Sequence, residues 1–228
     1  KPKMARNLQT RLRSALLAAC ATFTLAAPAI AAPEPAGLTP AELDSLVART
    51  MQAFQVPGLA VGVVKDGQVV FAKGYGVRRL GEAATVDPDT IFSIGSNSKA
   101  FTTAALAMLV DEKKLKWDDK VIDYLPDFRM YDPYVTREMT VRDLVTHRSG
   151  LPSYAGDLVF VPSSDFTRKE IIGALRHLKP ATSFRTRYAY DNLLYVAAGE
   201  VVPAASGQSW EDFVQGRILK KLGMEPCA

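Results

Sequence analysis

The feature that most constrains the fold of this chain is a single β-hairpin signal followed by a long stretch of helical signals. Two runs rich in β-formers, Leu59–Lys65 and Gln68–Val77, flank the pair Asp66-Gly67, which is typical of a tight hairpin. The first run is nearly all apolar, so we expect a strand that is covered on both faces of a sheet. A two-stranded hairpin is barely stable alone, and no strand pattern follows Gly199. We therefore expect the sheet to be completed by sequence outside this chain or by another chain.

Helix signals precede and follow the hairpin. Residues 39–42 combine an N-cap Thr, a Pro at the first helical position and a capping-box Glu, which predict a helix that ends near 56–58. Its apolar face would carry Leu43, Leu46, Val47 and Phe54. The segment Asn97–Glu112 is rich in Ala, Leu and Met, and we expect a long buried helix there.

The remainder of the chain reads as helices and loops. Thr-x-x-acid patterns at 140–143 and 167–170 predict helix starts, and residues 153–165 read as a loop. Further helices are expected at 192–202 and after Ser209, the latter with Trp210, Phe213, Ile218 and Leu219 on its inner side. The sequence thus indicates an α/β (α+β) fold with a helical subdomain over about 115–200.

The first 31 residues predict a secretory signal peptide. Residues 1–33 carry five cations and no acid, and an apolar run, 14–27, precedes the small-x-small site Ala29-Ile30-Ala31. The run is too short for a membrane span. We expect cleavage before Ala32, a periplasmic or secreted protein, and no membrane span afterwards. Leu17-Ala18-Ala19-Cys20 resembles a lipobox, so a lipoprotein anchored at Cys20 is the alternative.

Composition excludes several classes of function. Without the leader, 23 Lys and Arg face 24 Asp and Glu, so no basic patch argues for nucleic acid. Only two His and two Cys are present. A His-rich zinc site is therefore not expected, and we predict no metal and no cofactor. Signal cleavage would leave one thiol and hence no internal disulfide.

Ser96 and Lys99 form a Ser-x-x-Lys pair at the start of a predicted helix. Positions i and i+3 share a helix face, so the amine can reach the hydroxyl and activate it as a nucleophile. The helix N-terminus would also offer N–H groups to an oxyanion. The plainer interpretation is an N-cap Ser beside a solvated Lys. The surroundings of Lys99 argue against this plainer interpretation. Lys99 is the one charged residue between Asp89 and Asp111, and a lone cation in such an apolar stretch needs a partner.

Tyr190 and Asn192 stand two residues apart in a predicted loop and can face one cavity. A nearby ammonium would favour the phenolate of Tyr190 for proton transfer, and Asn192 can both donate to and accept from an amide. By themselves, such Tyr residues are more often packing groups.

His147 invites a Ser-His-Asp hypothesis, but a structural role is favoured. It follows an apolar helix turn and lies just before Gly150, where an imidazole typically bonds local backbone. The Gly-x-Ser-x-Gly elbow of another hydrolase class is absent, because no Gly follows Ser96 at the second position.

Taken in order, these segments resemble one family: class C β-lactamases, penicillin-binding DD-peptidases, and related esterases and aminopeptidases. The resemblance runs from about Ala41 to Met224. It rests on the following segments of the sequence: Thr90–Ser96 with Lys99, Leu115–Asp119 with Tyr124-Leu125-Pro126, Leu144–Pro152, Tyr190-Asp191-Asn192, Ser206–Ser209 and Leu222-Gly223-Met224. Residues 32–228 would then form the N-terminal part of a β-lactamase/transpeptidase-like domain.

The resemblance implies a fold and roles for the four site residues. It implies an antiparallel sheet flanked by helices plus an all-α domain, with the site between them. Ser96 would form an acyl-enzyme, Lys99 and Tyr190 would move protons, and Asn192 would hold the acyl amide. His147 matches a motif that is structural in the family. The expected partner is a small-molecule or peptide substrate. These motifs do not encode the class of the substrate (β-lactam, D-peptide or ester), and they do not encode the oligomeric state of the protein.

One family motif has no counterpart here. The family carries Lys-Thr-Gly or His-x-Gly on a sheet strand that also supplies an oxyanion-hole N–H, and neither triplet occurs in the 228 residues. Loss of one such donor typically costs about a hundredfold in turnover. We therefore expect a C-terminally truncated domain with an incomplete sheet. The alternative to an active serine hydrolase is an inactive remnant or a penicillin-binding module without turnover.

Overall fold

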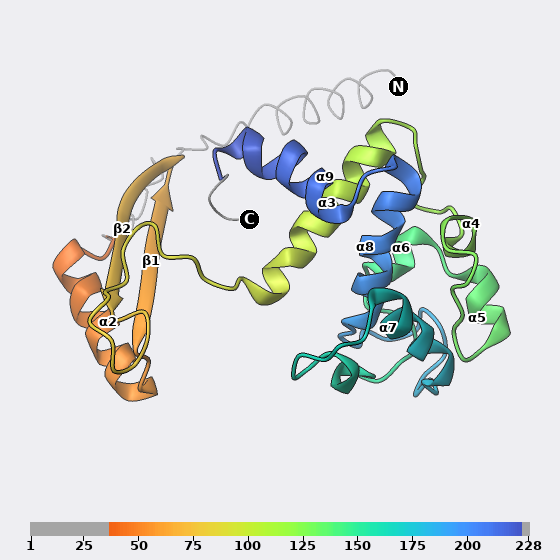
Figure 1. Ribbon diagram of the computed structural model, residues 1–228, viewed down its shortest axis with the longest axis horizontal. Helices are drawn as coiled ribbons and strands as arrows, with labels where there is room; N and C mark the ends of the chain where they lie inside the picture. Colours follow the sequence, from red (N-terminus) through yellow and green to blue (C-terminus); the bar gives the residue numbers. More distant parts are fainter. Residues whose placement is uncertain (1–36, 225–228) are drawn as a thin grey trace, which may run out of the picture. The chain divides into compact units, whose positions relative to one another are not determined.

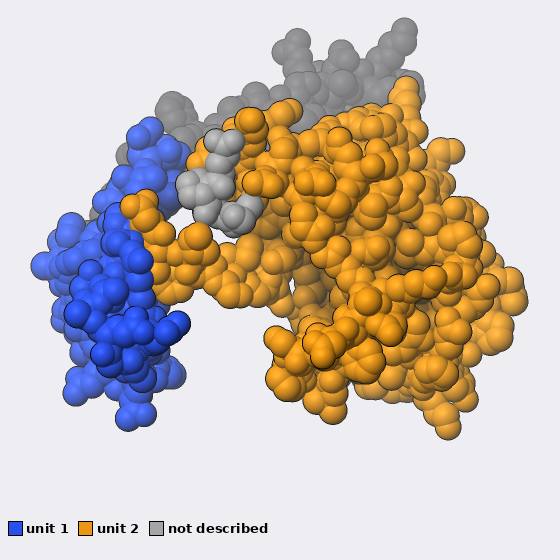
Figure 2. All heavy atoms as spheres, viewed as in Figure 1, with its two compact units in different colours: residues 1–88 blue, residues 89–228 orange. Residues whose placement is uncertain are grey.

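A computed structural model describes residues 37–224, which fall into two compact units with a boundary between Pro88 and Asp89. Figure 1 traces the elements along the chain, and Figure 2 colours the two units separately. The signal peptide predicted for 1–31, with Cys20, lies outside the described residues, as does Cys227.

The first unit begins with helix α2, Pro40–Phe54, and its predicted N-terminus is confirmed. The Thr39 side chain accepts the backbone N–H of Glu42 at 3.3 Å, and the Glu42 carboxylate accepts the backbone N–H of Thr39 at 2.7 Å. This reciprocal pair satisfies donors that a helix start leaves free. The helix ends where Gln55 adopts the left-handed conformation. Of its predicted apolar face, Val47 is buried whereas Phe54 is 77% exposed.

The predicted hairpin is confirmed as β1, Gly58–Lys65, paired antiparallel with β2, Gln68–Gly76. Asp66 and Gly67 both have positive φ angles, 51° and 75°, as a type I′ turn requires. Asp44 of α2 accepts hydrogen bonds from Lys73 and Tyr75 of β2 at 2.8 and 2.7 Å. These contacts fasten the hairpin to the helix, and Figure 1 shows the ribbons of the two elements side by side.

The expectation that β1 is covered on both faces is wrong for the described residues. Along β1, half-buried Val61 and Val63 alternate with exposed neighbours, and Val64 is 67% exposed. Such alternation is that of a strand with one covered face. Within residues 37–224 the sheet consists of β1 and β2, so the apolar run has no second layer to pack against there.

The second unit is helical and centres on the contact between α3, Ser98–Asp111, and α8, Leu193–Ser206. Helix α3 buries Thr102, Ala105, Leu106 and Leu109, the i, i+3, i+4, i+7 spacing of one helix face. The long helix expected at 97–112 is confirmed, and it is buried on this one face, since Ala100 and Ala104 on the other side are exposed. Helix α8 extends past the predicted end to Gly207, whose φ of 75° forms a left-handed C-cap.

Shorter elements surround this pair (Figure 1). The described helices are α4 Val121–Tyr124, α5 Pro133–Glu138, α6 Val141–Leu144, α7 Arg168–Ala174 and α9 Trp210–Val214, with short 3₁₀ or π turns at Gly95–Asn97, Asp157–Val159, Leu175–His177, Gln215–Leu219 and Lys220–Leu222. Both capping boxes, at Thr140 and Thr167, are confirmed. The indole N–H of Trp210 donates to Thr102 at 3.1 Å and so ties α9 to α3.

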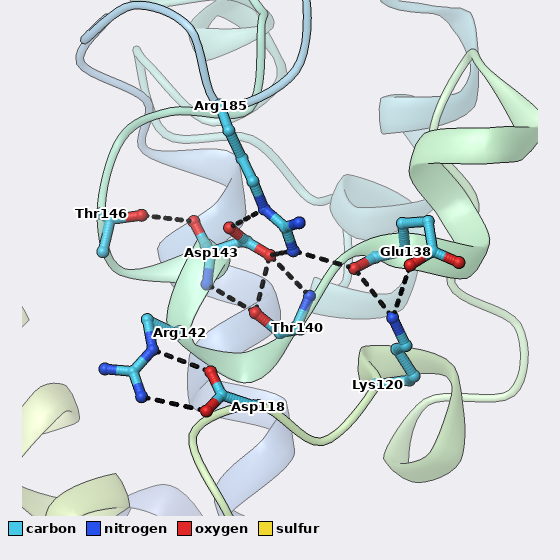
Figure 3. Close-up of polar contacts among 8 residues, drawn as sticks. All are labelled: Asp118, Lys120, Glu138, Thr140, Arg142, Asp143, Thr146 and Arg185. Carbon is cyan, nitrogen blue, oxygen red and sulfur yellow. Dashed lines mark hydrogen bonds and ion pairs between the residues drawn. The ribbon is translucent and has the colours of Figure 1, made fainter.

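A polar cluster around Asp143 anchors the segment that leads to Tyr190 (Figure 3). The guanidinium of Arg185 donates to both carboxylate oxygens of Asp143, at 2.9 and 2.6 Å. The backbone N–H and hydroxyl of Thr140 donate to the same carboxylate at 2.9 and 2.6 Å. Burial alone would raise the pKa of Asp143, but these bonds outweigh it and hold the pKa below its ordinary value.

Among residues 37–224, no helix combines the length and apolar character that crossing a bilayer requires.

Candidate active site

The Ser-x-x-Lys pair lies where the chain turns into α3. Ser96 belongs to the 3₁₀ turn Gly95–Asn97, and Gly95 has a φ of 50°, a conformation that favours glycine. Ser96 is exposed, while Lys99 is half-buried one turn further on. The Lys99 ammonium donates to Ser96 Oγ at 3.2 Å. The predicted i, i+3 contact is therefore present.

Tyr190 reaches the same oxygen from a distant part of the chain. Its hydroxyl donates to Ser96 Oγ at 2.6 Å. The backbone around it is fixed on both sides, because Ala189 N–H donates to the carbonyl of His147 and Tyr154 N–H donates to the carbonyl of Tyr190, at 2.9 and 2.8 Å. The phenol is thus held by a scaffold rather than by its own contact with Ser96.

Asn192, just before the first residue of α8, completes the group. Its Oδ1 accepts from the Lys99 ammonium at 2.6 Å, and its Nδ2 donates to Asp157 Oδ2 at 2.9 Å. All four residues predicted from the sequence therefore meet in one cluster. The packing of α3 against α8 brings their N-terminal ends together.

The charge of Lys99 governs the electrostatics of this cluster. Its Nζ lies 4.7 and 5.2 Å from the ring centroids of Tyr190 and Tyr195, within cation–π range. The ammonium of Lys99 and the hydroxyl of Ser96 lower the pKa of Tyr190, because both favour the phenolate. The site thus makes the phenol of Tyr190 easier to ionise than an isolated tyrosine.

His147 supports Tyr190 rather than Ser96. Its ring lies 4.6 Å from that of Tyr190 and 5.2 Å from that of Tyr195, and its Nδ1 accepts the backbone N–H of Asp191 at 3.1 Å. Burial and the Lys99 charge lower the pKa of His147, which suits an acceptor nitrogen. The predicted structural role agrees with this geometry. The expectation of a local backbone partner is wrong, because the partner lies 44 residues away.

Asp191 is fully buried beneath the loop that carries Tyr190 and Asn192. Its Oδ1 accepts the backbone N–H of Leu194 at 3.3 Å, and its Oδ2 lies 3.4 Å from the donating hydroxyl of Ser149. Burial raises its pKa to about 6, although these hydrogen bonds act in the opposite direction. Asp191, which lies between Tyr190 and Asn192, therefore accepts a backbone N–H of the first turn of α8.

Sequence reasoning missed three neighbours of the cluster: Asp157, Asp191 and Tyr195. Asp191 stands between two predicted site residues, which would have been a usable signal. Asp157 follows Gly156 in a segment that reads only as loop, so nothing local marks it. Tyr195 is the third residue of α8, and its hydroxyl donates to the carbonyl of Val145 at 3.0 Å.

A cavity of about 400 Å³ opens beside Ser96. Its polar lining includes Ser96, Lys99 and Asn192, and its apolar lining includes Phe160 and Val196. Within the part of the chain that the structure describes, His, Cys, Asp and Glu side chains form no group suited to a metal ion. The arrangement offers a nucleophile, two proton-transfer groups and an amide beside an open space.

Comparisons with known proteins agree with this arrangement. A family model described as "Beta-lactamase" matches residues 43–228. Unguisins hydrolase ungD' of Aspergillus campestris is 33% identical over 81% of this chain and 35% of the relative. Protein flp of Staphylococcus aureus (strain COL) is 30% identical over 80% of this chain and 37% of the relative. The chain thus spans about a third of the length of the curated relatives it matches.

Solved structures with the same fold include enzymes and penicillin-binding homologues. The octameric penicillin-binding protein homologue of Pyrococcus abyssi is 32% identical, with a TM-score of 0.72 over 82% of this chain and 44% of that chain. A class C β-lactamase in complex with cefoxitin is 27% identical, with a TM-score of 0.68 over 81% of this chain and 49% of that chain. The predicted fold class is confirmed. The chain belongs to the β-lactamase family.

Proposed function

We propose that the protein is a serine hydrolase that forms an acyl-enzyme at Ser96 on an amide, β-lactam or ester substrate. The observation that carries the proposal is the convergence of Tyr190 and Lys99 on one oxygen, at 2.6 and 3.2 Å from Ser96 Oγ. Two proton-transfer groups aimed at a single exposed hydroxyl are what nucleophilic catalysis requires. A Ser with a purely structural role does not require contacts from both Lys99 and Tyr190.

In the proposed reaction, Ser96 Oγ attacks the substrate carbonyl carbon while its proton passes to the phenolate of Tyr190. The lowered pKa of Tyr190 supports this role. Lys99 stabilises the phenolate and passes a proton on when the carbonyl carbon loses its leaving group. Water then repeats the attack on the acyl group, which returns the product acid and free Ser96. Asn192 would hold the acyl amide or its equivalent.

Covalent labelling tests the proposal directly. The protein should react with a fluorescent penicillin or a fluorophosphonate, and Ser96→Ala should abolish the label. Ser98→Ala is the matched control, because Ser98 follows the same turn as the first residue of α3 but makes no side-chain bond to Lys99 or Tyr190 in the described structure. A label that persists in Ser96→Ala, or no label with either probe, would overturn the proposal.

The substrate class is a separate question, because the chain covers about a third of its curated relatives. Those relatives include proteins named unguisins hydrolases, and a solved neighbour is a class C β-lactamase bound to cefoxitin. A panel of a chromogenic cephalosporin, a D-amino-acid peptide and a short-chain ester would separate the three classes. We expect the substrate that is turned over to compete with the Ser96 label.

A second candidate is a penicillin-binding module without turnover. The likeness to the penicillin-binding protein homologue of Pyrococcus abyssi, 32% identical to this chain, supports it. The two candidates differ in the fate of the label. A stable Ser96 adduct with no release of product supports the binding module, whereas Ser96-dependent hydrolysis of any panel substrate supports the enzyme.

We also propose export to the periplasm or the medium. The five cations, the apolar run and the site at Ala29-Ile30-Ala31 support it. N-terminal sequencing of the mature protein should begin at Ala32. A lipid-modified N-terminus at Cys20 would instead support the lipoprotein alternative, and an unprocessed N-terminus would contradict both.

A further inference from the structure

Asp157 is a half-buried carboxylate that joins the cluster through Asn192. The loop that carries it is held against the start of α8 by close contacts. Tyr154 N–H donates to the carbonyl of Tyr190. Gly156 has a φ of 79°, and a Cβ at this position would lie 2.7 Å from the Leu193 side chain. The positive φ favours glycine at this position, and the approach of the loop brings Asp157 to Asn192.

The contact settles which end of the Asn192 amide faces Lys99. A carboxylate only accepts hydrogen bonds, so Asp157 Oδ2 selects the Nδ2 end of the amide, at 2.9 Å. The Oδ1 end is then left for the Lys99 nitrogen, at 2.6 Å. An amide turned by 180° would place its oxygen against the Asp157 carboxylate, where two acceptors repel.

The fixed amide holds Lys99 beside Ser96. With Oδ1 turned towards Lys99, the ammonium donates to Asn192 at 2.6 Å and to Ser96 Oγ at 3.2 Å. A turned amide would present Nδ2–H to the ammonium, and two donors cannot form a hydrogen bond. The orientation that Asp157 selects is therefore the one in which Asn192 holds Lys99 at Ser96.

The other oxygen argues against a purely stabilising role for Asp157. Its Oδ1 is buried and has no hydrogen-bond partner among the described residues. A buried polar atom without a partner costs stability. A carboxylate that stabilises the fold, such as Asp143, uses both oxygens. Asp157 instead uses a single oxygen, and uses it on Asn192.

We infer that Asp157 is a positioning residue that orients the Asn192 amide, and through it the Lys99 ammonium, for attack by Ser96. The inference rests on the proposed function for its kinetic consequence. The orientation of the amide can be measured independently of activity.

The test compares Asp157→Ala, Asp157→Asn, Asn192→Ala and the double variant Asp157→Ala with Asn192→Ala. We expect Asp157→Ala to slow Ser96 labelling by the fluorophosphonate about tenfold, the worth of one charge-assisted hydrogen bond. Asp157→Asn retains an acceptor oxygen and should fall between Asp157→Ala and the wild type. In the Asn192→Ala background, Asp157→Ala should have no further effect. The exposed Asp165 of the same loop region supplies the control, Asp165→Asn, which should label at the wild-type rate.

A structural role would give a different pattern. It predicts that Asp157→Ala slows labelling equally with and without Asn192, in step with a lowered midpoint of thermal unfolding, and this result would overturn the inference. The side-chain NH₂ resonances of Asn192, assigned by their loss in Asn192→Ala, give a readout without chemistry. We expect them to move upfield and exchange faster in Asp157→Ala.

The two failures are distinguishable. If the wild type shows no Ser96-dependent label but the Asn192 resonances change as expected, the proposed function fails and the orienting role stands. If the wild type is labelled while neither the rate nor the resonances respond to Asp157→Ala, the inference fails and the proposed function stands.

Discussion

Replacing Asp191 by Asn should make the protein more stable at neutral pH than at acidic pH, relative to the wild type. Asp191 is fully buried and its carboxyl group has a pKa raised to about 6. Its protonated form therefore suits the folded state better than its ionised form does. Asn has nearly the same shape, keeps an acceptor for the Leu194 N–H and never ionises.

The magnitude follows from the two pKa values. A rise from 3.8 to about 6, at about 1.4 kcal/mol for each unit of pKa, corresponds to about 3 kcal/mol. Because the folded pKa is raised, the favourable contribution is complete below about pH 3.8, falls as the pH rises, and is lost above about pH 6. The free energy of unfolding of Asp191→Asn minus that of the wild type should rise by about 3 kcal/mol across this window.

Urea unfolding at several pH values between 3.5 and 7.5 measures this difference, and subtraction of the wild-type curve removes the other titrating groups. Asp165→Asn, which makes the same change of side chain at an exposed position, is the control. A flat difference for Asp191→Asn, or one that falls as the pH rises, would refute the reasoning from burial.

Three further predictions concern the residues around the nucleophile. Tyr190→Phe should slow Ser96 labelling about a hundredfold and remove the rise in rate that the wild type shows as the pH increases through the lowered pKa of Tyr190; an unchanged pH–rate profile would count against Tyr190. His147→Ala should slow labelling less than Tyr190→Phe, because it removes only the ring that supports the phenol, and an equal or larger loss would indicate a direct role. Asp143→Ala should lower the free energy of unfolding by about 2 kcal/mol, because the partners of the carboxylate are left unpaired. The loss is limited because Arg185 is about half exposed and can be solvated. A change below about 0.5 kcal/mol would show that the cluster in Figure 3 does not stabilise the fold.

The parts of the fold that the sequence predicted well are those set by local chemistry. The capping boxes at Thr39, Thr140 and Thr167 each involve residues three positions apart, and the hairpin depends on the two residues of its turn. The Ser96–Lys99 contact has the same local origin. Such features are fixed by spacing along the chain, so a single sequence suffices to find them.

The features that were missed depend on contacts between distant segments. The bond from Asn192 to Asp157 spans 35 residues and the bond from Asp191 to His147 spans 44. No periodicity reports such pairs, because they arise from the docking of one loop on the start of α8. The expectation that β1 is covered on both faces was wrong for a related reason, as exposed Val64 shows. An apolar run indicates which side chains a strand can bury, but the elements that pack against the strand decide which of them are buried.

The central claim is that Ser96 Oγ is the nucleophile. The most direct measurement is the mass of the peptide that contains Ser96 after the protein reacts with a fluorophosphonate. We expect a single adduct on Ser96 in the wild type and in Ser98→Ala, formed more slowly in Tyr190→Phe and absent in Ser96→Ala. An unmodified Ser96 peptide after full reaction, or an adduct on another residue that survives Ser96→Ala, would contradict it.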